Sequence, residues 1–146
     1  MSDETIHAHP HPRGEMLAQI STRLVQLHSQ FYGKGPTKAK THLLNDMVVS
    51  VLRGGFTTVE RTLLDTGEKD TVYQMRHSFQ QVMERDFRQV VEDATGRNVI
   101  AYMSTVHTDP DLAVELFVLE PSELPEPGDV EGSTVELGRT EADEGD

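Results

Sequence analysis

The sequence predicts an α+β fold, in which an antiparallel sheet of two β-hairpins is packed by two longer helices and one short helix. Three observations lead to this prediction. Two long segments carry apolar residues at intervals of three and four, the spacing of an amphipathic helix. Two other segments each contain a pair of apolar-rich runs separated by turn-forming residues, the pattern of a β-hairpin. A short segment between the first hairpin and the second long helix begins with a capping box.

The first element is a helix that ends before Gly33. Its apolar stripe is formed by Met16, Ile20, Leu24, Leu27 and Phe31. Gly33 lies where a left-handed residue commonly ends a helix. A loop over residues 33–37 then leads into an extended segment.

The extended segment, residues 38–53, is rich in Val, Leu and Thr. Asn45-Asp46 in its middle can adopt the positive φ angles of a two-residue hairpin turn. We therefore expect two antiparallel strands, followed by a break at Gly54-Gly55.

Two helices are expected next. Thr57 and Glu60 have the spacing of a capping box, and the short helix that they begin runs to about Asp65 and stops at Gly67. The long helix covers residues 71–95 and stops at Gly96. Its stripe indicates core packing rather than a cofactor site and consists of Val72, Met75, Phe79, Val82, Met83, Phe87, Val90, Val91 and Ala94.

The second hairpin is predicted from residues 99–107 and 112–119, which flank the turn sequence Thr108-Asp109-Pro110-Asp111. Both hairpins are apolar on two sides. The last strand places Leu112, Val114, Leu116 and Val118 on one face, and Ala113, Phe117 and Leu119 with Glu115 on the other. The first hairpin likewise separates Ala39, Leu43, Val48 and Leu52 from Leu44, Met47, Val49 and Val51.

One layer of helices covers only one face of a sheet. Apolar residues on both faces therefore favour a homo-oligomer, most simply a homodimer, that buries the second face. The alternative is that the alternation is imperfect and the hairpin register differs from the expected one.

Composition sets the class of protein. The 146 residues make one ordinary domain, and the chain has no cysteine, which fits a reducing compartment such as the cytoplasm. No apolar stretch approaches the ~18 residues of a membrane-spanning helix, and residues 1–14 have no signal-peptide core, so we expect a soluble protein without membrane insertion.

The net charge of −12 is concentrated at one end. Residues 120–146 have ten acidic side chains and one basic side chain, whereas residues 1–119 have a charge of only −3. We expect residues 120–146 to be a disordered acidic tail, with a tether or decoy for a basic partner as the alternative. The nearly neutral domain, residues 14–119, and this tail argue against nucleic-acid binding.

Residues 1–13 are expected to be a flexible, His-rich leader. Its histidines, His7, His9 and His11, could bind a metal adventitiously, but a functional metal site would require a further ligand and a rigid frame.

Several phrases between residues 15 and 119 together resemble the MpsC family, which is named for a component of a sodium-translocating, membrane-potential-generating system. They are Phe31-Tyr32-Gly33-Lys34-Gly35-Pro36-Thr37, Gly55-Phe56-Thr57-Thr58-Val59-Glu60-Arg61-Thr62-Leu63, residues 72–76 with Phe79, Thr95-Gly96-Arg97 and Val114-Glu115-Leu116-Phe117-Val118-Leu119. The resemblance implies a small soluble domain associated with a membrane cation or bicarbonate uptake system. It implies no catalytic residues.

Two candidate sites follow from the residues. The segment with Gly33, Lys34, Gly35, Lys38 and Lys40 could bind an anion, although a tight structural turn is the alternative, because the loop follows a helix instead of preceding one. Glu60 and Arg76 could form an interhelical ion pair, against the alternative of a capping glutamate and a solvated arginine.

No arrangement of nucleophile, base or metal ligands points to catalysis, so we expect neither enzyme activity nor a cofactor. The favoured hypothesis is a non-catalytic accessory or regulatory protein that binds membrane transport subunits, with the acidic tail tuning that contact. The alternative hypothesis is a small-molecule or anion-binding module.

Overall fold

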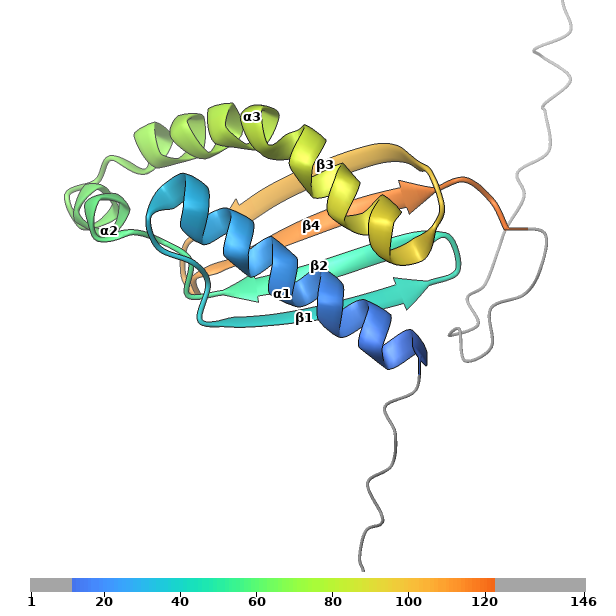
Figure 1. The fold of residues 1–146 in the computed structure, drawn as a ribbon. Helices are drawn as coiled ribbons and strands as arrows, with labels where there is room; N and C mark the ends of the chain where they lie inside the picture. The colour runs from blue at the N-terminus through green and yellow to red at the C-terminus, as the bar shows by residue number, and fades with distance from the viewer. Residues whose placement is uncertain (1–11, 123–146) are drawn as a thin grey trace, which may run out of the picture.

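A computed structural model describes residues 12–122 of the protein and confirms the α+β class (Figure 1). The elements are α1 (Pro12–Tyr32), β1 (Lys38–Leu44), β2 (Met47–Arg53), α2 (Thr58–Asp65), α3 (Lys69–Thr95), β3 (Val99–His107) and β4 (Leu112–Leu119). Helices α1 and α3 lie side by side on one face of the sheet, and α2 lies beyond its end (Figure 1).

The ends of the elements follow local sequence signals. Gly33 and Gly96 adopt positive φ angles of 79° and 69° after α1 and α3, as predicted. The antiparallel pairing of β1 with β2 confirms the hairpin, and of the two turn residues Asn45 has a positive φ, 54°, whereas Asp46 does not. Helix α1 begins at Pro12, a residue suited to the first helical position because its fixed φ is already helical.

The sheet joins the two hairpins through their inner strands, in the order β1-β2-β4-β3, and all neighbours are antiparallel. Val49 on β2 pairs with Leu116 on β4 and with His42 on β1. The β2–β4 pairing connects segments about 60 residues apart in the chain, since β2 ends at Arg53 and β4 begins at Leu112. It brings the β3–β4 turn to the same end of the sheet as the start of α2.

The core lies between α1, α3 and one face of the sheet. Phe87 of α3 and Phe117 of β4 are both fully buried, together with Ile20 and Leu24 of α1. The face of β4 that the helices cover is the one that carries Glu115.

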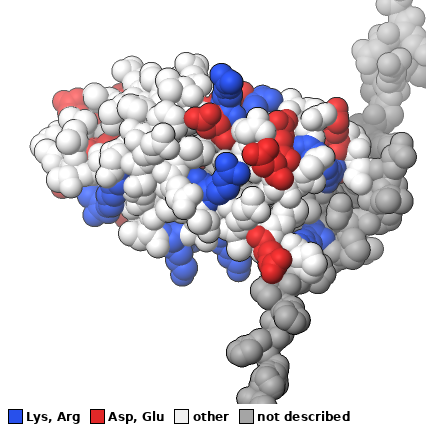
Figure 2. All heavy atoms as spheres, viewed as in Figure 1, with Lys and Arg blue, Asp and Glu red and all other residues white. Residues whose placement is uncertain are grey.

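The predicted stripe of α3 needs one correction at Val82, which is 65% exposed. Met83 is buried, and its neighbour Val82, turned about 100° away around the helix, falls on the solvent side at this point of α3. In addition, α3 buries a charged residue, Arg76, which is only 3% exposed. On the helix-covered side of the molecule, basic and acidic side chains are interspersed (Figure 2).

Candidate functional site

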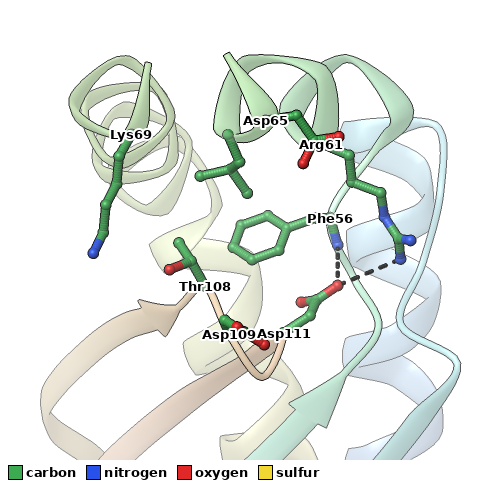
Figure 3. A pocket seen from close by; sticks show the side chains of 8 residues that line it. Phe56, Arg61, Asp65, Lys69, Thr108, Asp109 and Asp111 are labelled. Atoms are coloured by element: carbon green, nitrogen blue, oxygen red, sulfur yellow. Dashed lines mark hydrogen bonds and ion pairs between the residues drawn. The ribbon is translucent and has the colours of Figure 1, made fainter. Parts of the chain in front are cut away.

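An open hollow of about 560 Å³ lies where α2, the start of α3 and the β3–β4 turn meet (Figure 3). The ring of Phe56 lies between α2 and the turn (Figure 3). The residues that line the hollow combine an apolar centre with both signs of charge: Phe56, Arg61, Leu64, Asp65, Lys69, Thr108, Asp109 and Asp111.

Asp111 holds one wall of the hollow together. Its carboxylate oxygen Oδ2 accepts a hydrogen bond from the backbone N–H of Phe56 at 3.2 Å and lies 3.6 Å from Nη2 of Arg61 (Figure 3). Its backbone carbonyl accepts from the N–H of Gly54 at 3.3 Å. These contacts tie the β3–β4 turn to α2 and to the segment that precedes it.

The other charged side chains that line the hollow make fewer contacts within the described residues than Asp111 does. The carboxylates of Asp65 and Asp109 have no hydrogen bond or ion pair with any residue of the described range 12–122. The ammonium of Lys69 lies 5.5 Å from the centre of the Tyr73 ring, a cation–π contact. The hollow therefore offers two carboxylates beside an apolar surface. Within residues 12–122, no group of three or more His, Asp or Glu is arranged to hold a metal ion.

Behind Phe56 lies a buried ion pair between Glu60 and Arg76. The guanidinium Nη2 of Arg76 donates to Oε1 of Glu60 at 2.7 Å and to the carbonyl of Gly55 at 2.9 Å. Glu60 also completes the predicted capping box with Thr57, through hydrogen bonds of 2.8 and 3.1 Å. Glu60 thus fills both predicted roles, whereas the interpretation of Arg76 as a solvated side chain is wrong.

Aromatic rings enclose the guanidinium of Arg76. Its central carbon lies 4.1 Å from the centre of the Tyr32 ring and 5.0 Å from that of Phe56. Burial opposes ionisation of Glu60, but the hydrogen bonds from Arg76 and Thr57 outweigh it and hold the pKa of Glu60 below its ordinary value. The pair is therefore charged at neutral pH and links α2 to α3.

A second buried polar cluster joins α1 to the sheet. Oε2 of Glu115 accepts a hydrogen bond from the Tyr102 hydroxyl at 2.7 Å, and its Oε1 lies 3.6 Å from Nε2 of His28. Nδ1 of His28 lies 2.9 Å from the carbonyl of Leu24 and, in the neutral ring, donates to it. Burial raises the pKa of Glu115 to about 7 and lowers that of His28 to about 4. Glu115 is 1% exposed and His28 3% exposed, so this cluster lies inside the domain and not on its surface.

The five residues predicted to bind an anion do not line a common hollow. Lys34 donates to the backbone carbonyl of Phe56 at 3.1 Å and so ties the α1–β1 loop to the segment before α2. Gly35 packs against α1, where an added Cβ would lie 3.0 Å from the carbonyl of Val25. Lys38 and Lys40 alternate with the buried Thr41 on β1 and belong to the other face of the sheet. The anion-binding module therefore has no specific support, and the predicted leader ligands His7, His9 and His11 lie outside the described residues.

The sequence analysis did not find the hollow. Asp109 and Asp111 were assigned only to a turn and Asp65 only to a helix end, whereas Lys69 lay between the two expected helices and was not singled out. The sole local signal was the gathering of charged residues at 60–70 and 108–111. Only the β2–β4 pairing, which is not visible in either segment, brings them together. The second cluster had a clearer signal, because Glu115 is the single charged residue in an apolar strand.

Comparison with known proteins bears on the whole described region. A family model described as "Na+-translocating membrane potential-generating system (MpsC)" matches residues 12–121. The uncharacterized protein YrhF of Bacillus subtilis (strain 168) is similar, with 26% identity over 97 residues, which cover 65% of this chain and 80% of YrhF. No solved structure matches the chain. None of the described helices is long and apolar enough to cross a membrane.

Proposed function

The chain belongs to the MpsC family, and from this premise we propose that it is a non-catalytic accessory or regulatory subunit of a membrane cation-transport system. The family is named for a sodium-translocating, membrane-potential-generating system, which supports a role beside membrane proteins. In this role the domain acts by binding a transport subunit from the cytoplasmic side.

The observation that carries the proposal is the hollow between α2 and the β3–β4 turn, with the carboxylates of Asp65 and Asp109 beside the ring of Phe56. Cytoplasmic loops of membrane proteins are enriched in Lys and Arg. A long basic side chain from such a loop would lay its aliphatic stem on Phe56 and bring its charge to the two carboxylates. The fixed wall at Asp111 means that little ordering of the hollow opposes this contact.

The acidic segment beyond the described residues fits the same partner. Residues 123–146 have nine acidic side chains and one basic side chain. Such a segment attracts basic loops at long range and raises the rate of encounter more than the final affinity. In this proposal the segment tunes the contact, and the hollow provides its specificity.

Recovery from native membranes tests this function. The full chain with a C-terminal tag, isolated from gently solubilised membranes of its own organism, should bring transport subunits with it. Neutralising both carboxylates (Asp65→Asn with Asp109→Asn) should lower the recovered partner about tenfold, since two charge contacts together contribute roughly 1–2 kcal/mol.

Two further proteins serve as controls. Glu15→Gln with Asp86→Asn changes the net charge equally at exposed positions outside the hollow and should recover the partner as the wild type does. A chain that ends at residue 122 measures what the acidic segment adds. Recovery of the wild-type protein alone, or an equal loss in both double variants, would contradict the proposal.

A further inference from the structure

The face of the sheet that points away from α1 and α3 is largely apolar along β2 and β4, whereas the edge strand β1 contributes Lys38, Lys40 and His42 beside Leu44. Both helices that pack on the sheet lie on its other face (Figure 1). On the open face, Met103 is 52% exposed and Met47 39% exposed. The apolar residues that the strand register places there are Leu44, Met47, Val49, Val51, Ala101, Met103, Leu112, Val114, Leu116 and Val118.

These residues form one continuous patch centred on β2 and β4. Across the middle of the sheet, Val49 pairs with Leu116, which pairs with Met103. Val51 and Val114 form the next apolar row. Four strands about 4.8 Å apart and seven residues long make a face about 19 Å wide and about 23 Å long, a flat footprint of about 440 Å². This flat footprint is about half of the ~800 Å² per partner that a standard stable interface buries.

We propose that a second copy of this chain covers the open face, so that the protein is a homodimer in which two sheets pack face to face. A two-fold axis offers each copy an apolar patch identical in size to its own. Aligned sheets pack in this way about 10 Å apart, with their side chains interdigitated.

The charges around the patch select an orientation. The cations of the open face gather at one corner, where Lys38 pairs with Arg53 and Lys40 follows on β1. The register places no Asp or Glu on this face among the described strands. A two-fold axis in the interface plane, perpendicular to the strands, lays this corner over the β1–β2 turn of the other copy. The carboxylate of Asp46 in that turn pairs with Arg97 of its own chain but stays 39% exposed, so the cationic corner faces a partly neutralised acid in this orientation.

The acidic segment of the same chain is a poorer occupant. Residues 123–146 contain four Leu or Val residues among nine acids. Such a segment complements the cationic corner but has too little apolar area to cover ten apolar side chains. A second copy provides both the apolar area and the opposing charge.

Sedimentation of the full chain tests the dimer. From about 1 to about 100 µM, the wild type should sediment as a species of twice 16.3 kDa. Leu116→Lys should weaken self-association at least a hundredfold, because it buries like charges across the two-fold axis. Val82→Lys makes the same change at an exposed position of α3 and should leave the dimer intact. A wild type that is monomeric at ~100 µM, or a Leu116→Lys variant that remains dimeric, would overturn the proposal.

A labelling experiment identifies the occupant even if Leu116→Lys disturbs folding. The chain has no cysteine, so Met103→Cys places a single thiol on the open face. Maleimide should label this thiol slowly in the dimer and faster after dilution into the monomer range. Protection that persists in the monomer would overturn the proposal in favour of the acidic segment, and fast labelling at every concentration would overturn it in favour of an uncovered face.

Discussion

Arg76→Met should lower the free energy of unfolding by about 3–5 kcal/mol, because it leaves the buried carboxylate of Glu60 without its counter-charge. The carbonyl of Gly55 also loses its hydrogen bond. Urea denaturation monitored by circular dichroism measures the change. The matched control is Arg23→Met, which breaks an exposed α1–α3 ion pair with Asp93 and should cost less than about 1 kcal/mol.

A double-mutant cycle measures the coupling free energy between Glu60 and Arg76 apart from their other contacts. Glu60→Gln alone should also destabilise the domain, since it leaves the charge of Arg76 buried between Tyr32 and Phe56. With both substitutions present, the loss should be smaller than the sum of the single losses by about 1–3 kcal/mol. Additive losses, or a loss at Arg76 no larger than that at Arg23, would show that the pair does not anchor α2 to α3.

The second large effect concerns the pH dependence of stability, to which His28 and Glu115 contribute in opposite directions in the wild type. Burial lowers the pKa of His28 from 6.5 to about 4, so the stability that comes from the neutral ring is present above pH 6.5 and is lost as the pH falls toward 4. Burial raises the pKa of Glu115 from 4.5 to about 7, so the stability that comes from the protonated carboxyl is present below pH 4.5 and is lost as the pH rises toward 7. Between pH 4.5 and 6.5 the two trends oppose each other.

Substitution of His28 or Glu115 should leave the pH dependence of stability that comes from the other residue unopposed. Relative to the wild type, Glu115→Gln should become less stable as the pH falls from 6.5 to 4.5, by up to about 1.4 kcal/mol per pH unit. His28→Phe should instead become less stable, relative to the wild type, as the pH rises from 4.5 to 6.5. The hydroxyl of Tyr102 and the charge of Arg76 also face this cluster and remain in both variants. Melting curves across pH 4.5–7 measure both slopes, and two profiles parallel to that of the wild type would contradict the assignment.

Local structure was predictable because its causes lie within a few residues of each element. The positive φ angles at Gly33, Asn45 and Gly96 and the capping box of Glu60 were all expected, and all are present. The face of each strand could not be assigned, because β4 is apolar on both sides. Most of a strand's stabilisation comes from neighbours that are distant in sequence. The burial of Glu115 depends on His28 and Tyr102, which other elements contribute.

The candidate site was less predictable than the fold. The loop with Lys34 suggested an anion site, but the ammonium of Lys34 is held by the carbonyl of Phe56. The hollow with Asp65 and Asp109 arises only when β4 pairs with β2 and carries the β3–β4 turn to α2. Its residues come from segments about 40 positions apart, and no motif spacing links them.

Photo-crosslinking from the hollow in native membranes tests the accessory function most directly. A photoreactive residue in place of Leu64, which lines the hollow, should crosslink to an integral transport subunit. The same residue in place of the exposed Val82 on α3 should not, and Asp65→Asn with Asp109→Asn should reduce the crosslink at position 64. Crosslinks to soluble proteins alone, or equal crosslinking from positions 64 and 82, would contradict the proposal that this domain binds a membrane transport subunit through the hollow.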